Sequence, residues 1–314
     1  IAQDGIVMNL DDLACVGIWD KIVISSTVNR NSRNFPGEAL AALIDGTECF
    51  LQELRDLGIN VQNGGGETAD VGDLTGTVAV DSCAVAIADR NEILDNKNIV
   101  GGLSIIGFAS SGQAIYENFN NSGIGSNGLT SARHELLSSH YLENYPESYD
   151  PSTETKYLYC GPYRIYDFLK GSELSVGEAL LSPTRTYLPL LKKISSELGN
   201  ELKGAVHCSG GGQTKCLKFG TKVKYVKDSM FEPPPIFSEI KRVSQTSTKE
   251  MYQVYNMGHR LEIFCDSRYE KSVLEIAKEF RIDAKVIGYT ETRNDNLPTN
   301  QLDINYGEGL ISYG

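Results

Sequence analysis

Hydrophobic positions in the first hundred residues alternate between the spacing of helices and the spacing of strands. Apolar residues recur at helical spacing along 6–14, where Gly17 would end the helix, and along 40–57 before Gly58. Runs of β-branched and other apolar residues indicate three strands, at 21–28, 59–62 and 76–89. Together these elements predict an α/β unit.

A polar stretch at 90–102 separates this unit from the rest of the chain. We place a domain boundary near residue 100, between an N-terminal domain of residues 1–100 and a C-terminal domain of residues 101–314. In the second domain, strands are predicted at 103–109, 205–208, 261–265 and 284–289. Helices are predicted at 129–142, at 182–199 with an irregularity at Pro189, and at 267–280. The strand at 261–265, the helix at 267–280 and the strand at 284–289 form a β-α-β or split β-α-β unit.

Two segments of the second domain lack a regular pattern. Residues 110–127 are polar and rich in Gly and Asn, which predicts a mobile loop rather than a packed element. Residues 143–172 are rich in tyrosine and indicate an extended excursion with many turns. The sequence assigns no function to this excursion.

The composition limits the classes of partner. The chain has 29 basic and 41 acidic residues, a formal net charge of -12, which argues against DNA or RNA as the main partner. A small phosphorylated ligand held through Mg²⁺ and local N–H groups stays compatible with that charge. The 7 cysteines are scattered and show no C-x-x-C spacing, which indicates reduced thiols and a cytoplasmic protein. No apolar run is long enough for a membrane span.

Two glycine triplets carry the candidate chemistry. Gly64–Gly66 leads into Glu67 and Asp70, and Gly210–Gly212 leads into Lys215. Glycine lets backbone N–H groups approach an anion, and the carboxylates of the first triplet suit Mg²⁺. Neither triplet has the spacing of a P-loop. The alternative for each triplet is a plain turn.

The first predicted helix has an acidic edge. Asp4 and Asp11 stack on one side of it, and Asp12 lies one step round. The edge is either a solvated face or part of a site.

Six motifs, in this order, resemble the aminoimidazole ribonucleotide synthetase family, also called phosphoribosylformylglycinamidine cyclo-ligase, of purine biosynthesis. They are Asp11-Asp12-Leu13, Gly65–Ala69, Ser126–Gly128 before a helix with Arg133, Leu181–Tyr187, His207–Gly212 and Glu250–Gly258. The Met-Tyr-x-x-x-Asn-x-Gly element in the last motif separates this family from relatives that make selenophosphate, phosphorylate thiamine phosphate or mature hydrogenase.

The resemblance implies a fold and a reaction. The fold is a two-domain α/β synthetase type, in which the N-terminal domain gives strands to a barrel shared across a homodimer and the C-terminal domain covers the site. The reaction is an ATP-dependent ring closure of formylglycinamidine ribonucleotide. It passes through an O-phosphorylated imidate and yields aminoimidazole ribonucleotide, ADP and phosphate.

The resemblance also implies a nucleotide site in the N-terminal half. Asp12, Glu67 and Asp70 would hold Mg²⁺ on the triphosphate, because hard oxygen ligands suit that ion. Gly65, Gly66, Glu67 and Thr68 would form the loop that binds ATP. The alternative for the two loop carboxylates is the capping of a helix.

In the C-terminal half, the amides of Gly210, Gly211 and Gly212 would cradle a phosphate. Arg185 and Thr184 would bind a phosphate or carboxylate, and His207 would donate to a phosphate or move a proton. Asn127 and Asn256 would touch the substrate. The alternatives are an inter-helix salt bridge for Arg185, a structural role for His207, an exposed helix lysine for Lys215 and pinned turns for the two asparagines.

The sequence departs from the family pattern in several places. The early Asp-Gly-x-Gly-Thr-Lys strand, whose lysine helps bind nucleotide, has no counterpart, so we expect a chain that lacks its natural beginning or that strand. Gly125 replaces the histidine usual before Ser-Asn-Gly, and Gln113 to Gly123 resembles an insertion. Two further hypotheses therefore stay open: another ATP-dependent member of the superfamily, and a catalytically silent nucleotide-binding relative.

Overall fold

The structure is a computed structural model that describes residues 1–293 and 299–314. Its N-terminal part is a three-stranded sheet of order β2-β1-β3, in which β1 pairs parallel with β2 and antiparallel with β3. The strands are β1 (Ile22–Arg30), β2 (Val61–Asp70) and β3 (Val78–Val85), and the helices are α1 (Ala2–Ala14) and α2 (Gly37–Asp56). The two predicted helices and the strands predicted at 21–28 and 76–89 are confirmed, whereas the short strand predicted at 59–62 is a longer strand, β2.

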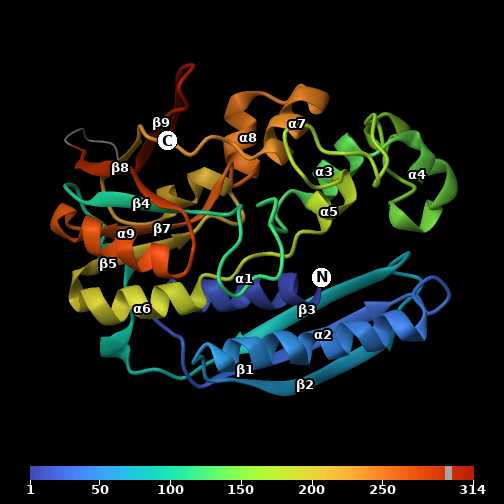
Figure 1. Cartoon of the computed structure of the whole chain (residues 1–314), viewed down its shortest axis with the longest axis horizontal. Helices are drawn as coiled ribbons and strands as arrows, with labels where there is room; N and C mark the ends of the chain where they lie inside the picture. The colour runs from blue at the N-terminus through green and yellow to red at the C-terminus, as the bar shows by residue number, and fades with distance from the viewer. Residues whose placement is uncertain (294–298) are drawn as a thin grey trace.

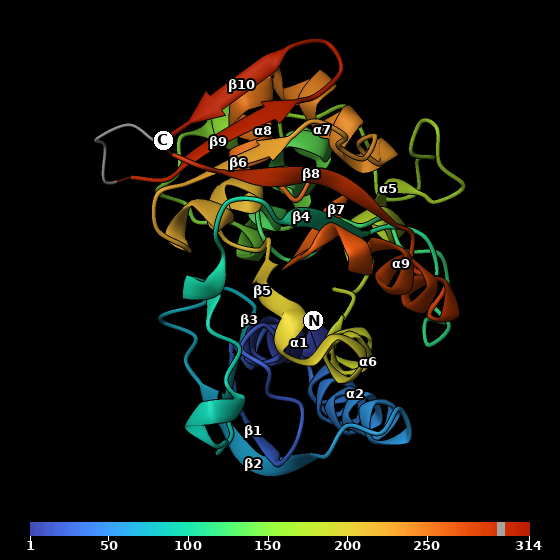
Figure 2. The ribbon, with the colours of Figure 1, turned by 90° about the vertical axis from the view of Figure 1, so that its left-hand side faces the viewer.

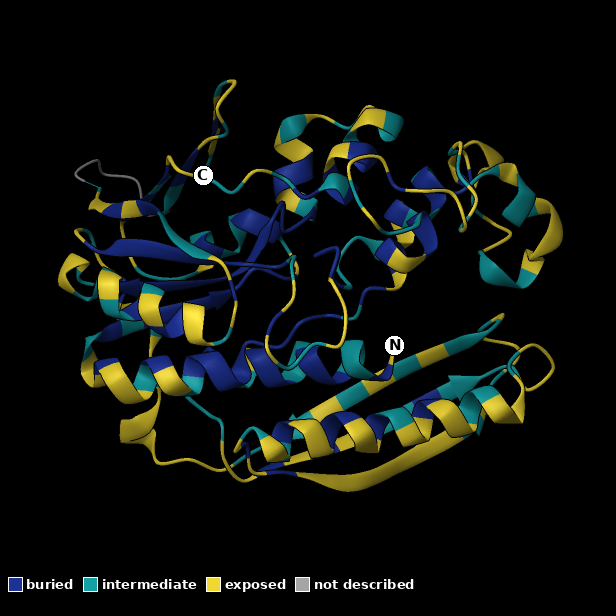
Figure 3. Cartoon of the chain, in the orientation of Figure 1, coloured by how far each residue is buried: buried dark blue, intermediate teal, exposed yellow. Residues whose placement is uncertain are grey.

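Both helices pack on one face of this sheet (Figure 1). Ile22 and Ile24 of β1 are buried against the helices, because alternate residues of a strand point to opposite faces. Val23 and Val85 are registered opposite each other on the other face, with 44% and 58% of their surface exposed. That second face is open in this chain, and β2 is exposed along most of its length (Figure 3).

The first glycine triplet does not form a loop, so that prediction was wrong. Gly64 to Asp70 lies inside β2, in register with β1 after a shift between Ile24 and Ser26. A Cβ on Gly66 would collide with the carbonyl oxygen of Ser26. Gly64 and Gly66 are therefore needed for the close approach of two strands at a bulge.

The C-terminal part is a seven-stranded sheet of order β10-β9-β6-β8-β4-β7-β5 (Figure 2). Its strands are β4 (Ser104–Ala109), β5 (Leu202–His207), β6 (Val223–Lys227), β7 (His259–Cys265), β8 (Ala284–Thr292), β9 (Gln301–Asn305) and β10 (Leu310–Tyr313). Its helices are α3 (Leu129–Leu136), α4 (Ser139–Asn144), α5 (Val176–Leu181), α6 (Leu188–Leu198), α7 (Pro235–Ser244), α8 (Thr248–Val254) and α9 (Glu270–Glu279). Short 3-10 helices are η1 (Arg90–Glu92), η2 (Asn96–Asn98), η3 (Pro146–Ser148), η4 (Thr155–Tyr157), η5 (Gly199–Glu201), η6 (Gly212–Lys218) and η7 (Ser267–Tyr269).

The predicted strand-helix-strand unit near the end is a split β-α-β. Strands β7 and β8, joined by α9, both flank β4 and run antiparallel to it. One continuous hydrophobic cluster links the two sheets: Ile24 of β1, Leu10 of α1, Leu191 of α6 and Ile106 of β4 belong to it. Helices α1 and α6 thus lie between the two sheets and carry the core from one to the other (Figure 1).

Three details of the second half differ from the prediction. The helix expected at 129–142 is broken into α3 and α4 at Leu137 and Ser138, where the Ser138 amide donates to Tyr163. The helix expected from Ser182 begins at Leu188, so Pro189 stands in its first turn, where its missing N–H costs nothing. The loop 110–127 is packed, because residues such as Ala114 and Ile124 are buried in it.

Candidate functional site

The acidic edge of α1 forms hydrogen bonds with an extended segment, residues 182–187, which lies between α5 and α6. The Asp4 carboxylate accepts hydrogen bonds from Thr184 N at 2.8 Å and Thr184 Oγ1 at 2.5 Å. About two turns on, fully buried Asp11 accepts from Thr186 Oγ1 at 2.7 Å and Tyr187 N at 3.1 Å. Burial raises the pKa of Asp11. These contacts use Asp4, Asp11 and Thr184 to fix α1 on the C-terminal half.

Asp12 points to a different set of partners from the C-terminal half. Its Oδ1 lies 3.1 Å from His207 Nδ1, at the end of β5, and 3.4 Å from Lys215 Nζ, on η6. Lys215 also donates to Ser209 Oγ at 3.0 Å. The Asp12 side chain is 54% exposed, whereas that of His207 is fully buried. The structure therefore brings together Asp12, His207 and the second glycine loop.

The charges at this point are set by burial and by neighbours. Partial burial alone would raise the pKa of Asp12, but His207 and Lys215 outweigh it and lower the pKa, so the carboxylate is ionised. Burial lowers the pKa of His207 in spite of the hydrogen bond to Asp12. A neutral imidazole can donate to the carboxylate only with its proton on Nδ1. His207 Nε2 then stays an unprotonated nitrogen, buried without a partner among the described residues.

The second glycine triplet is a loop, as predicted. Gly211 has a φ of 93° and stands at the N-cap of η6. The amides of Gly210 and Gly211 donate to no acceptor within residues 1–293 and 299–314, and a Cβ on Gly210 would meet open space. Gly212 is packed instead, because its Cβ would lie 2.6 Å from the Tyr255 carbonyl oxygen. Two bare amides beside an ionised carboxylate and a lysine form an arrangement that suits a metal-bound phosphate.

Arg185 has no N–H left for a ligand. The buried guanidinium makes a two-point contact with Glu117 at 2.9 and 2.5 Å. Its remaining donors reach the carbonyl oxygens of Ala109, Ser111 and Gly112 at 2.8 to 2.9 Å. Arg185 therefore ties the 110–127 loop to the extended segment 182–187.

The two asparagines pin turns in this structure. Asn256 donates to the carbonyl oxygens of Gly123 and Ile124, and its Oδ1 accepts from Ser110 Oγ and Gly258 N. Asn127 donates to the Val254 carbonyl oxygen.

Glu67 and Asp70 do not meet Asp12 within one copy of the chain. Glu67 is registered with Thr27, which places it on the open face of the three-stranded sheet, whereas α1 packs on the other face. Asp70, at the end of β2, accepts from Ser32 N at 3.2 Å and Ser32 Oγ at 2.5 Å. The neighbouring positions Gly65, Gly66 and Thr68 are exposed on the same edge strand.

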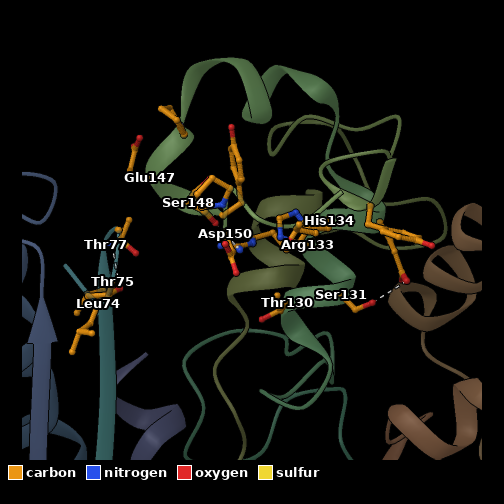
Figure 4. A pocket seen from close by; sticks show the side chains of 18 of the residues that line it. Leu74, Thr75, Thr77, Thr130, Ser131, Arg133, His134, Glu147, Ser148 and Asp150 are labelled. Atoms are coloured by element: carbon orange, nitrogen blue, oxygen red, sulfur yellow. Dashed lines mark hydrogen bonds between the residues drawn. The ribbon is translucent and has the colours of Figure 1, made fainter. Parts of the chain in front are cut away.

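A large cleft lies where the β2–β3 turn faces α3 and the tyrosine-rich segment (Figure 4). Its volume is about 1280 Å³, and Thr75, Ser148, Arg133 and His134 are among its walls. Arg133 donates to the Ser148 carbonyl oxygen at 2.9 Å, while Arg133 Nε and His134 Nδ1 are buried without a partner in the described chain. Arg133 also lines a smaller cavity of about 690 Å³ between α1, β3 and α5. The sequence analysis missed this cleft, although the Ser-Asn-Gly motif before α3 pointed to its helix.

Both halves of the chain match family models. Residues 1–88 match the model described as AIR synthase related protein, N-terminal domain, and residues 102–297 match the corresponding C-terminal domain. A protein of Methanocaldococcus jannaschii named phosphoribosylformylglycinamidine cyclo-ligase is 28% identical over 314 residues, 100% of this chain and 77% of that protein.

Two solved structures show the same fold at low identity. The hydrogenase maturation protein HypE in complex with ATP has a TM-score of 0.62 at 10% identity, covering 99% of this chain and 78% of that chain. T. maritima PurL complexed with FGAR has a TM-score of 0.56 at 13% identity, covering 99% and 41%. In the part of the chain that the structure describes, no helix is both long and apolar enough to cross a membrane.

Proposed function

The chain belongs to the AIR synthase related protein family, and on that premise we propose that it catalyses the ATP-dependent closure of formylglycinamidine ribonucleotide to aminoimidazole ribonucleotide. The name of the Methanocaldococcus jannaschii relative supports this reaction, and the ATP complex of HypE supports a nucleotide. The observation that carries the proposal is the contact of Asp12 with His207 and Lys215 beside the bare amides of Gly210 and Gly211.

The residues at this point fit a magnesium nucleotide. Asp12 is ionised and half exposed, so its carboxylate would hold Mg²⁺, which neutralises phosphate charge when bound. The amides of Gly210 and Gly211 would donate to phosphate oxygens, and Lys215 supplies a counter-charge within reach of the same loop. His207 is buried behind Asp12 and would hold that carboxylate in one orientation rather than meet the substrate.

The carboxylates on β2 would complete the site from a second copy of the chain. Val23 and Val85 leave an apolar patch on the open sheet face, and Glu67 projects from that same face. We propose that in a homodimer that covers this face, Glu67 and Asp70 of one copy, with Gly65, Gly66 and Thr68, reach past the edge strand β2 to the nucleotide held by Asp12 of the other. This arrangement agrees with the shared barrel that the resemblance implies.

The reaction would proceed in two balanced steps. The amide oxygen of the substrate attacks the γ-phosphorus of ATP, ADP leaves, and an O-phosphorylated imidate forms. A nitrogen of the same substrate then attacks the imidate carbon, phosphate leaves with the former amide oxygen, and loss of a proton completes the ring. The protein's part is positioning and charge neutralisation. We assign Arg185, Thr184, Asn127 and Asn256 to holding the 110–127 loop and the segment 182–187 in place.

The test is a steady-state assay of the dimeric protein for aminoimidazole ribonucleotide that depends on both ATP and formylglycinamidine ribonucleotide. Product formation, lost in Asp12→Asn, supports the proposal. ADP release with a different acceptor and no aminoimidazole points to another member of the superfamily. Tight Mg-ATP binding by calorimetry without any turnover points to the silent nucleotide-binding relative.

A further inference from the structure

A buried ion pair lies beneath the second glycine loop. Lys227 on β6 and Glu262 on β7 have fully buried side chains and contact each other through Lys227 Nζ and Glu262 Oε1. Strands β8 and β4 separate β6 from β7 in the sheet. Gly288 is registered beside Lys227 and Gly107 beside Glu262, so the strand next to each charged residue carries no side chain at the registered position. The lysine can therefore reach across the sheet.

The pair is joined to the glycine loop by one residue. Lys227 Nζ also donates to the main-chain oxygen of Gln213 at 2.9 Å and to its Oε1 at 3.1 Å. Gln213 directly follows Gly212 and is fully buried. Its Nε2 donates to the carbonyl oxygens of Asn256 at 2.6 Å and His259 at 3.0 Å. The first turn of η6 is thus held in place by the Lys227 ammonium group and by the main-chain oxygens of Asn256 and His259.

The other side of η6 faces the nucleotide site. Lys215, two residues after Gln213, contacts Asp12 and Ser209. We propose that the Lys227–Glu262 pair is a positioning device, which acts through Gln213 to hold the Gly210 and Gly211 amides and Lys215 in register with Asp12. The inference rests on the proposed function for the identity of the bound phosphate, but the positioning itself is a property of the unliganded chain.

Stability does not account for the pair. Removing two charges from water costs about as much as their attraction returns, and apolar replacements of similar size are often neutral or stabilising. What the pair adds is directional contact with one main-chain oxygen of η6. A resident metal is also not required here: Cys208, His259 and Glu262 present ligand atoms within 4.8 Å of one another, but Lys227 already supplies the positive charge at the shared carboxylate.

The experiment uses the full chain with both charges replaced, Lys227→Met with Glu262→Leu. The matched control is Lys224→Met with Asp303→Asn, which removes a partly exposed pair that joins β6, the strand of Lys227, to β9. The readouts are the melting temperature, amide hydrogen exchange of residues 210–216 without ligand, and the Kd for Mg-ATP.

We expect the double variant to melt within about 5 °C of the wild type. The hydrogen-bonded amides of residues 210–216, such as those of Gly212 and Thr214, should exchange at least tenfold faster, and the Kd for Mg-ATP should rise at least tenfold. The control should change neither. Unchanged exchange of the loop in the folded double variant overturns the proposal.

If the double variant does not fold, Lys227→Gln with Glu262→Gln decides the question, because it keeps two polar side chains in the sheet and removes the ammonium group that binds the Gln213 main-chain oxygen. Faster exchange of residues 210–216 supports positioning, and wild-type exchange overturns it. A wild-type protein that binds no Mg-ATP would refute the proposed function, and the exchange measurement would still decide this inference.

Discussion

Asp12 Oδ1 lies 3.1 Å from His207 Nδ1, although the two residues are 195 positions apart in the chain. Asp12 belongs to the last turn of α1, and His207 ends β5 in the other sheet. The contact places a half-exposed carboxylate on a fully buried imidazole. A carboxylate that is held in one orientation beside the glycine loop suits the metal-bound nucleotide that we propose. A carboxylate without such a partner on a helix surface would change its orientation.

The role of His207 as a support for Asp12 can be tested by substitution. His207→Ala removes the donor, so the Kd for Mg-ATP should rise about tenfold, the value of one hydrogen bond to a charged group. His207→Asn keeps an N–H near the position of Nδ1 and should recover most of the affinity. Because burial lowers the pKa of His207, the imidazole is neutral from pH 7 upward. The pH dependence of kcat between pH 7 and 8 should be the same in His207→Asn and wild type. A change of kcat with pH that occurs in the wild type and is absent from the variant would contradict the role of His207 as a support for Asp12.

The proposed site shared between two copies predicts complementation between two inactive variants. Asp12→Asn and Glu67→Gln homodimers should each lose nearly all activity. When the two are unfolded and refolded together, half of the dimers are mixed, and each mixed dimer has one intact site. The mixture should therefore regain about one quarter of wild-type activity.

A mixture that stays inactive while mass spectrometry shows mixed dimers would place both carboxylates in one copy or exclude Glu67 from the site. Mixing Asp12→Asn with itself after the same refolding is the control.

The two glycines of the second loop should respond differently to alanine. Gly212→Ala places a Cβ 2.6 Å from the Tyr255 carbonyl oxygen at a φ of 49°, and should cost about 1–3 kcal/mol of unfolding free energy. Gly210→Ala meets open space, so the unfolding free energy should change by less than about 1 kcal/mol. That methyl group stands where a phosphate would approach, and Mg-ATP binding should weaken. Urea titration and calorimetry measure the two effects, and equal destabilisation by both variants would rule out this division.

The buried ion pair predicts a pH dependence of stability. Burial alone would raise the pKa of Glu262, but Lys227 and His259 lower it to about 2, below the unfolded value of about 4.3. A carboxyl with a lowered folded-state pKa stabilises the fold above its unfolded pKa, and that contribution is lost as the pH falls toward 2. The loss is about 3 kcal/mol.

Urea unfolding at several pH values between 5 and 2 measures this loss. The curve of Lys227→Met with Glu262→Leu should be flatter than that of the wild type by the equivalent of one proton. Parallel curves would show that Glu262 titrates normally in the folded chain.

Local patterns in the sequence determined most helices and strands of the first half and strands β4, β5, β7 and β8 of the second. Ile6 and Leu10 are spaced as on one face of a helix, and Ile22 and Ile24 are spaced as on one face of a strand. The buried face of each element follows from this spacing. The acidic edge of α1 was visible in the same way, since Asp4 and Asp11 differ by seven residues.

Tertiary structure decided what those residues contact. Gly66 belongs to a strand because its neighbour in space is Ser26, and no local pattern records that neighbour. All N–H groups of Arg185 donate to residues of the 109–117 segment. This arginine, which the sequence motif suggested as a ligand-binding residue, therefore connects two loops. Lys227 reaches Glu262 across two strands that lie elsewhere in the sequence. Side-chain type and spacing fix local geometry, whereas the charge state and accessibility of a group depend on burial and long-range partners that arise only when the sheets pack.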